Sequence, residues 1–595
     1  INIKEIINSK SPGFLSKYPS FISDLFFSFL NRVLFILRIN RFLSEHGDKT
    51  GIEFIEELFD HLDISYRVSS KDREKIPSEG KLIVVANHPL GGLDGLILLK
   101  MISEVRADVR IIANDVLMNI KNLSEYFLPF DILSSKDLKK NYKLISEALQ
   151  KDYAIIIFPA GEVARLTING IKDKKWNRGS VYFADKFQTP VLPIFIKGRN
   201  SILFYITSLF SKKLSMFLLP YELFNKRNKT FDIKIGHPIS PKALNTKYQK
   251  TEFLSKSLKK HLYLISKNKK GIFQTEKNII HPVSTRQVRR ELFANELLGE
   301  TTDHKKIFLV EYEKGKNVLK EIARLREITF RKVGEGTGGK KDSDKYDKYY
   351  KHIVLWDDNN LEIVGSYRFA EGNFVMNNFG ADGFYSSSLF KFNNELMPYL
   401  FNSIELGRSF IQSKYWNSLA LDYLWQGIGK YLSTNKSTRY LFGPVSMSNN
   451  YSSEAKNLII QFYSKWFPHK NNFITPNTPY LLSNESKSLF ENLFTSNDYN
   501  KELILLKNLL SNLGFSIPTL FKQYADLCIP GGVQFAGFNI DKNFRDCVDA
   551  FIIIDLNYLK ENKRKRYLNT VEQNITAYTF NEKVSAKHQT IVEIK

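Results

Sequence analysis

Cysteine and long apolar runs are both scarce in this chain of 595 residues. Its two cysteines, Cys528 and Cys547, are too few for a disulfide framework or a metal cluster. No uninterrupted apolar stretch is long enough to predict a membrane span. Metal-ligand spacings and internal repeats are also missing from the sequence. These absences argue against a disulfide-rich secreted scaffold and a metal-cluster protein, and they favour a protein of the cytoplasm.

Negative charge is in short supply as well, with 62 Asp and Glu residues against 86 Lys and Arg residues and a formal net charge of +24. Most of the excess lies in residues 151–280. Nucleic acid, an anionic membrane surface and an acidic carrier protein all fit such a region on charge alone. Residues 18–43 and 201–224 predict amphipathic helices, which either lie in a membrane interface or pack on the protein's own core. Beside the basic charge, we expect the membrane surface.

Short β-branched runs alternate with helical patterns in the first half of the chain, which predicts a largely parallel sheet with helices on its faces. In the second half, a helical run is followed by a strand pair, a helix and another strand, which predicts a second α/β domain. The expected division is membrane-associating helices over residues 1–60, an α/β domain over 61–280, a linker over 281–304 and a second α/β domain over 305–595.

One motif stands at the end of the predicted strand at residues 81–86. It is Asn-His-Pro-Leu-Gly-Gly-Leu-Asp-Gly, and it places His88 at the carboxyl edge of the sheet, where open α/β folds hold their sites. The glycine-rich turn allows the Asp94 carboxylate to come back to the imidazole. A His held by a carboxylate is a general base for a hydroxyl that attacks a thioester, so we predict both as catalytic. The alternative is a chance pairing in a polar turn.

Later strand ends carry two further blocks. Residues 158–165 are Phe-Pro-Ala-Gly-Glu-Val-Ala-Arg, and residues 189–193 are Thr-Pro-Val-Leu-Pro. With His88 and Asp94, this series resembles the lysophospholipid acyltransferase family over residues 60–245. The resemblance implies an O-acyltransferase that needs no metal or cofactor. It also implies acceptor-binding or oxyanion-binding roles for Gly91, Gly92, Gly161, Glu162 and Arg165.

The departures from that family concern the acceptor. The spacing between His88 and Asp94 is one residue longer than is usual in the family, Glu162 follows Gly161 instead of preceding it, and Arg165 is displaced. Because the family uses this block to handle the acceptor's phosphate, the change argues against a phosphate-bearing acceptor. The variant resembles the hemolysin-like branch, which includes O-acyltransferases of lyso-aminolipids. The alternative for Glu162 and Arg165 is a plain surface pair.

Acidic and basic residues recur together in the second half of the chain. They resemble the pattern of acyl-homoserine-lactone synthases and ornithine-acyl-carrier-protein N-acyltransferases over residues 305–555, and the resemblance implies a GNAT-like fold. Aspartates suit an ammonium group, arginines suit a carboxylate, and Glu405 suits a base for the attacking amine. The alternative is a solvated loop with a simple ion pair. The predicted amino-acid- and carrier-binding residues are Arg326, Asp342, Asp344, Asp347, Arg368 and Arg408.

The two halves together resemble the fused bifunctional ornithine lipid synthases. The implied reaction is N-acylation of ornithine from a 3-hydroxyacyl-acyl carrier protein, followed by O-acylation of the new 3-hydroxyl. Glycine, lysine or a dipeptide as acceptor would need only a few altered contacts. The expected partners are acyl carrier protein, an inner-membrane lipid surface and an amino acid, with no nucleic acid, at the cytoplasmic face of the bacterial inner membrane. The alternative is a lysophospholipid acyltransferase with a regulatory or carrier-docking second domain, and the third reading is a non-catalytic binding protein.

Overall fold

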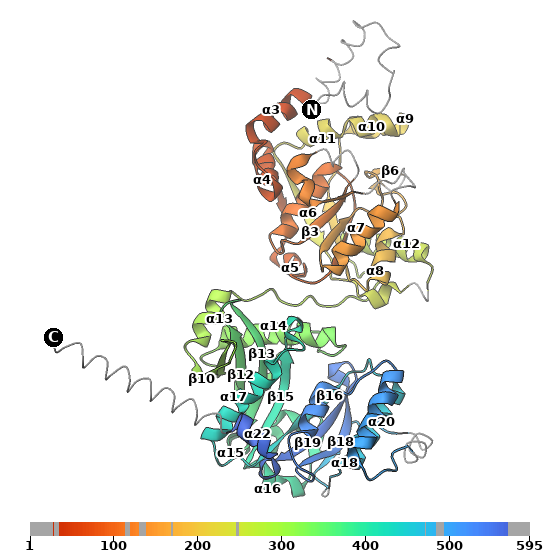
Figure 1. Cartoon of the computed structure of the whole chain (residues 1–595). Coiled ribbons are helices and arrows are strands. Elements are labelled where there is room, and N and C mark those ends of the chain that lie inside the picture. Colours follow the sequence, from red (N-terminus) through yellow and green to blue (C-terminus); the bar gives the residue numbers. More distant parts are fainter. Residues whose placement is uncertain are drawn as a thin grey trace, which may run out of the picture. The chain divides into compact units, whose positions relative to one another are not determined.

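Figure 1 shows the computed structural model of the chain. The structure describes residues 28, 35–113, 120–129, 138–167, 170–245, 249–469, 472–482 and 493–568. The chain forms two compact units, Ile1–His281 and Pro282–Lys595, and each is described here by itself. Both units combine helices with a sheet, so the predicted α/β class with two domains is confirmed. Within the described residues, no helix is both long and apolar enough to span a bilayer.

The first unit is built on a seven-stranded sheet with the order β1-β9-β8-β2-β5-β3-β4. Every neighbouring pair is parallel except β8 with β9, which confirms the largely parallel sheet. All five residues of β2 are buried, because β2 lies between β8 and β5 with cores on both faces. The strands are β1 (Ile64–Arg67), β2 (Leu82–Ala86), β3 (Val109–Ala113), β4 (Phe127–Pro129), β5 (Ala154–Ile157), β8 (Val191–Lys197) and β9 (Lys229–Ile235).

Alternate residues of β2 enter two different cores. Leu82, Val84 and Ala86 pack with α4 (Gly51–Leu62) and α6 (Gly92–Ser103), while Ile83 and Val85 pack with the opposite group of helices. That group is α7 (Leu138–Gln150), α8 (Gly179–Lys186) and α12 (Thr251–Ile265). Because successive side chains of a strand point to opposite faces, β2 is packed on both sides, and this fixes the start of the segment that follows it.

The predicted membrane-associating range, residues 1–60, needs correction at its end. Helix α4 buries Phe54, Ile55 and Leu58 in the unit's own core, so the domain begins before residue 61. Helix α3 (Ile36–His46) precedes it and contributes the buried Phe42 to the same core. The rest of the predicted helix at 18–43, apart from residue 28, lies outside the described residues.

The second unit holds an eight-stranded sheet with the order β10-β11-β12-β13-β15-β16-β19-β18. All neighbouring pairs are antiparallel except β15 with β16. Helix α14 (Lys316–Lys332) packs on one face, and α17 (Ala420–Thr434), α18 (Ser453–Trp466), α20 (Tyr499–Asn512) and α21 (Thr519–Ala525) pack on the other. The strands are β10 (Glu296–Glu300), β11 (Lys306–Val310), β12 (Lys351–Asp357), β13 (Glu362–Glu371), β15 (Ser403–Ile411), β16 (Tyr440–Met447), β18 (Val533–Asp541) and β19 (Cys547–Asp555).

The predicted linker at residues 281–304 is wrong. Helix α13 (Thr285–Leu292) buries Val288 and Leu292 against α14, and β10 is the edge strand that pairs with β11. Both elements belong to the second unit, which starts at Pro282. The segment looks like a linker in the sequence because only two residues of α13 are buried and β10 contains none.

Candidate functional sites

His88 lies directly after β2, at the carboxyl edge of the first sheet, as predicted. Its Nδ1 is 3.0 Å from Oδ2 of Asp94, which stands in the first turn of α6. This contact holds the proton on Nδ1 and leaves Nε2 as the basic nitrogen. The His88 side chain retains 18% exposure whereas Asp94 has none, so only the imidazole can meet a substrate. The pair has the geometry of a base and its orienting carboxylate.

The polar turn that precedes α6 fixes the Asp94 carboxylate. The backbone N–H groups of Leu90 and Gly91 donate to Oδ2 at 2.8 and 3.1 Å. Burial raises the pKa of Asp94, while the contact with His88 and the two N–H groups act in the opposite direction. Gly91 has φ +84°, and a Cβ there would lie 2.9 Å from Leu219 Cδ2. The turn therefore requires glycine at this position.

Asp173 is a site residue that the sequence analysis missed. It lies 85 positions from His88, yet its Oδ1 accepts the His88 backbone N–H at 3.1 Å. Its Oδ2 accepts Nε1 of Trp176 at 2.9 Å, and burial raises the pKa of its carboxyl. No motif surrounds Asp173 in the sequence, because the segment reaches His88 only through the fold. On the other side, the ring of Phe158 stacks on the imidazole at 4.2 Å.

The block at residues 158–165 also lies beside His88. The backbone N–H of Ala164 donates to the His88 carbonyl at 2.7 Å. Arg165 is only 6% exposed, donates to Ser215 Oγ at 2.5 Å and lies 3.7 Å from Glu162, so the alternative of a plain surface pair is wrong for it. Glu162 also pairs with Lys174 at 3.3 Å. Arg165 is thus part of the interior next to the catalytic turn.

Two of the three predicted oxyanion donors are engaged by the protein itself. The N–H of Gly91 donates to Asp94, and the N–H of Gly161 donates to the Phe158 carbonyl at 3.0 Å. Their role as oxyanion donors is therefore corrected to a structural one, which builds the two tight turns. Gly92 is the first residue of α6, and its role stays a prediction.

The charged residues predicted in the second half do come together, as a buried network. Arg326 lies 3.2 Å from Asp342 and 3.1 Å from Asp347. Arg368 lies 2.6 Å from Asp344 and 2.9 Å from Asp347. Burial by itself would raise the pKa of Asp347, but the two guanidinium groups hold it well below its ordinary value. The alternative of a solvated loop is wrong, because these carboxylates are neutralised inside the protein.

Glu405 is enclosed by donors instead of facing a substrate. Its Oε1 accepts the backbone N–H of Ser386 at 2.6 Å and the Ser386 hydroxyl at 2.5 Å. Its Oε2 accepts the N–H of Tyr385 at 3.0 Å and the hydroxyl of Tyr350. It is 1% exposed, and burial raises the pKa of its carboxyl. This geometry is that of a carboxylate that shapes the 384–389 segment, so its predicted role as a base has no support from the contacts.

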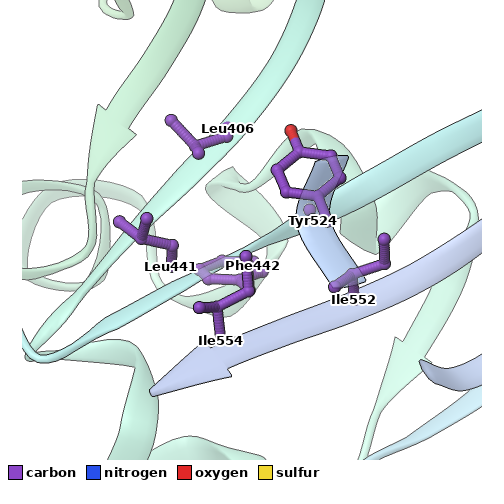
Figure 2. A pocket seen from close by; sticks show the side chains of 7 residues that line it. Leu406, Leu441, Phe442, Tyr524, Ile552 and Ile554 are labelled. Atoms are coloured by element: carbon purple, nitrogen blue, oxygen red, sulfur yellow. The ribbon is translucent and has the colours of Figure 1, made fainter. Parts of the chain in front are cut away.

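The parallel strands β15 and β16 separate shortly after they meet. They pair over Ser403–Glu405 and Tyr440–Phe442, after which β15 continues with β13 and β16 continues with β19. Gly443 stands at the point of divergence, with φ +151° and a would-be Cβ only 2.1 Å from the Leu406 carbonyl oxygen. A small apolar pocket opens there, as Figure 2 shows. Its lining is Leu406, Leu441, Phe442, Gly443, Tyr524, Ile552 and Ile554.

Residues 426–429, Gln-Gly-Ile-Gly, match a nucleotide-binding glycine loop in part, and in the structure they have a packing role. Both of its glycines lie within α17. A Cβ on Gly427 would meet Ile353 at 2.6 Å, and one on Gly429 would meet the Tyr567 carbonyl at 2.0 Å. These glycines let α17 approach the sheet and the segment at Tyr567, and they lie on no turn that cradles a pyrophosphate.

Comparison with known proteins adds the family. The model described as Acyltransferase matches residues 5–270, and the model described as Acetyltransferase (GNAT) domain matches residues 325–426. A glycine N(alpha)-acyltransferase of Phocaeicola vulgatus is 33% identical over 305 residues, which are 49% of this chain and 93% of the relative. The chain belongs to the acyltransferases, with one such domain in each half. A lyso-glycine lipid O-acyltransferase of Bacteroides thetaiotaomicron is 32% identical to this acyltransferase over 246 residues, 40% of the chain and 88% of the relative.

A solved structure is similar at lower identity. The 1-acyl-sn-glycerophosphate acyltransferase of Thermotoga maritima is 19% identical, with 41% of this chain and 94% of that chain covered and a TM-score of 0.24. A score so low carries no conclusion about substrate. The two family models and the two relatives support an architecture like that of a bifunctional aminolipid synthase.

Proposed function

We propose that this acyltransferase makes a phosphorus-free aminolipid with two acyl chains. The second unit acylates the amine of an amino acid with a 3-hydroxyacyl group, and the first unit then acylates the 3-hydroxyl. One observation carries the proposal. A single chain holds both a His–Asp acyl-transfer site and a GNAT domain, and its relatives are named for N-acylation of glycine and O-acylation of a lyso-glycine lipid.

The proposed acceptor of the N-acylation is glycine and not ornithine. The names of the relatives support glycine. The side-chain ammonium of ornithine would need a carboxylate, but Asp342, Asp344 and Asp347 already lie within 3.2 Å of Arg326 or Arg368. An acceptor without a cationic side chain makes no such demand. Glycine is therefore the proposed acceptor, and ornithine is the competitor that an experiment must exclude.

In the O-acylation step, His88 Nε2 takes the proton of the 3-hydroxyl as the oxygen attacks the acyl thioester. Asp94 keeps the imidazole in the correct tautomer and stabilises the imidazolium. The Asp173 carboxylate and the stacked Phe158 ring hold His88 in place from two sides. The imidazolium then returns its proton to the departing thiolate, so the base is restored at the end of the cycle.

For the acyl donor, we propose acyl carrier protein. The formal charge of +24 suits an acidic carrier, and the glycines of residues 426–429 lie within α17 and form no pyrophosphate loop. The test is to supply purified chain with 3-hydroxyacyl groups on either carrier protein or coenzyme A at equal concentration. The proposal expects a higher kcat/KM with the carrier protein.

We also propose that the first unit works at the cytoplasmic face of the inner membrane. Helix α9 (Ile202–Phe210) exposes five apolar side chains, of which Ile202 is 77% and Phe210 is 87% exposed. Lys212 follows at the start of α10 (Lys212–Phe217). Lys174 lies near enough to lower the pKa of Lys212, so two lysines lie beside the apolar face. Such a combination suits an anionic lipid surface.

Vesicle sedimentation tests this surface. Phe210→Glu should reduce binding of the full chain to vesicles that contain phosphatidylglycerol, because a carboxylate replaces an exposed ring. Leu481→Glu, in the second unit at 80% exposure, is the matched control and should bind as the parent does. Equal binding by both variants would refute α9 as the contact.

The lipid profile of a bacterial host that expresses the chain tests the whole proposal. The expected result is a new phosphorus-free, amine-positive lipid with two acyl chains, whose amino acid is glycine by mass. In a His88→Ala host, the mono-acylated precursor should accumulate instead. Ornithine in the product would correct the acceptor only. If the parent chain gives no new aminolipid but supports phosphatidate synthesis that His88→Ala abolishes, the alternative lysophospholipid acyltransferase is favoured.

A further inference from the structure

A second group of carboxylates lies close to Arg408 and has no part in the network of Arg326 and Arg368. Asp549 stands on β19, paired in register with Ser446 of β16, whose hydroxyl donates to its Oδ1 at 2.6 Å. Glu335 follows α14, and Asp541 ends β18; both interact electrostatically with Asp549. Arg408 of β15 interacts electrostatically with all three carboxyls, and its guanidinium lies over the ring of Tyr385 at 4.9 Å. The same guanidinium lies 3.7 Å from Asp342 and 4.0 Å from Asp344 of the other network.

The register of the sheet places this group at the divergence of β15 and β16. Side chains that are paired across antiparallel strands share a face, so Asp549 and Ser446 share a face with Phe442, at even spacing along β16. Leu441, Ile552 and Ile554 of the apolar pocket belong to the opposite face. Asp549 therefore lies on the face opposite to Leu441 and Ile552, beside the point where β15 and β16 separate, and the thioester is placed at this separation.

The burial of these groups suits the transfer of a proton to solvent. Asp549 is 2% exposed, whereas Glu335, Arg408, Tyr385 and Ser446 are half-buried and keep contact with water. Burial raises the pKa of Asp549 to about 7, and it raises the pKa of Glu335 to about 8, in each case with a neighbouring carboxylate adding to the effect. A peptide α-amine titrates at about 8, and the carboxylate of a free amino acid raises the pKa of its amine further, so a carboxyl with a raised pKa is better matched to this ammonium group than an ordinary carboxylate.

Burial raises the pKa of Glu405 as well, but four donors already occupy its two oxygens. We propose that Asp549, and not Glu405, is the general base that accepts the proton of the amino-acid ammonium group in the second unit, with Glu335 passing that proton to solvent. This inference rests on the proposed N-acylation. The other groups that face Asp549 are Asp541 from β18, Cys547 from β19, Ser446 from β16 and Arg408 from β15.

The step balances without a further reactant. The ammonium gives one proton to the Asp549 carboxylate and becomes a neutral amine. The nitrogen lone pair then attacks the thioester carbonyl, the C–N bond forms, and the C–S bond breaks. The amine's second proton leaves with the thiolate as a thiol, and the Asp549 proton leaves through Glu335. The products are an N-acyl amino acid, a free thiol on the donor and one proton in solvent.

The pH profile of N-acylation by the full chain tests the proposal, with glycine as acceptor and 3-hydroxypalmitoyl-acyl carrier protein as donor. Asp549→Asn should lower kcat/KM by about 10²-fold to 10⁴-fold near pH 7, where the acceptor is an ammonium ion. The loss should shrink as pH rises above the pKa of the amine, because the free amine needs no base. Glycinamide, whose amine is less basic, should likewise be less affected than glycine.

Asp555→Asn is the matched control, since Asp555 ends the same strand and pairs with Arg439 at a partly exposed site. It should keep the parental profile. Glu405→Gln should lose activity by one factor at every pH, together with stability, as expected for a residue that shapes the 384–389 segment.

Two outcomes would overturn the inference. The first is an Asp549→Asn profile equal to that of the parent, and the second is a loss of the same factor at all pH values. If the parent itself acylates no amine, the proposed N-acylation falls and this inference falls with it. If the parent acylates glycine and the Asp549→Asn profile is unchanged, only the inference falls.

Discussion

The two groups of predicted site residues differ in sequence separation and in burial. In the first unit, His88 and Asp94 are six positions apart, and the imidazole keeps some exposure at the end of a fully buried strand. In the second unit, Arg326, Asp347 and Arg368 span more than forty positions and are almost wholly buried. The first arrangement leaves a reactive nitrogen at the surface of a rigid scaffold. The second neutralises charge inside the fold.

This difference predicts which substitutions affect activity and which affect stability. A residue such as His88 holds little of the fold together, so its loss should remove activity and spare stability. A residue such as Arg368 neutralises two carboxylates in the interior, so its loss should destabilise the unit first. The presence of a charged residue in a motif therefore does not indicate a catalytic role until its contacts are known. Glu405, with both oxygens occupied, makes the same point.

The largest effect is expected for His88→Ala, which should lower O-acylation by about 10²-fold to 10⁴-fold, as for the loss of a general base. N-acylation and the urea unfolding midpoint should stay at parental values, as measured on the purified full chain. His304→Ala, an 82% exposed histidine, is the control. A large fall in stability in His88→Ala would break the contrast between the two sites.

Arg368→Leu should lower the free energy of unfolding of the second unit by about 3–5 kcal/mol, because it leaves Asp344 and Asp347 without one of their cations. Tryptophan fluorescence in urea measures this, since four of the five tryptophans, all except Trp176, lie in the second unit. Arg439→Leu removes a half-exposed pair and should cost about 1 kcal/mol or less. Equal costs for both would contradict the role given to the buried network.

Gly443→Ala should lower the stability of the second unit by about 1–3 kcal/mol, since it strains a residue at φ +151°. Its Cβ would also displace the Leu406 carbonyl at the point where β15 and β16 separate. Because the thioester is placed there, N-acylation should fall while O-acylation is kept. Gly407→Ala, whose Cβ meets nothing within 4 Å, is the neighbouring control. Unchanged N-acylation in Gly443→Ala would place the acyl chain elsewhere.

The smallest effect is a pH dependence of stability in the second unit. The folded-state pKa is about 7 for Asp549 and about 8 for Glu335, above the ordinary values of 3.8 and 4.5. The folded state therefore holds protons that the unfolded state has released, and this stabilisation is lost as pH rises through about 7 to 8. Between pH 5 and pH 8.5, the urea midpoint should fall, and Asp549→Asn should make it depend less on pH. A parental midpoint that rises over this range would contradict the raised pKa values.

The local parts of both units were within reach of the sequence. The run at 81–86 and the glycine turn after it lead directly to the contact of His88 with Asp94, because few residues separate the partners. The strands β12 and β13 and the helix α14 likewise follow from their patterns. Asp173 was out of reach, since its bond to the His88 backbone crosses 85 positions and depends on how the chain returns to β2. The linker at 281–304 failed for a related reason, because β10 is a strand only by virtue of its pairing with β11.

The sequence by itself determined the α/β class, the pair of acyltransferase units and the contact of His88 with Asp94, since each rests on short-range pattern and spacing. Only the tertiary structure decided what the dispersed charged residues do. It closed Glu405 inside a ring of donors, paired the aspartates near residue 344 with arginines, and brought Asp549 to the gap between β15 and β16. The physical reason is that the ionisation and reach of a carboxylate depend on burial and on neighbours, and the folded chain supplies both from distant positions.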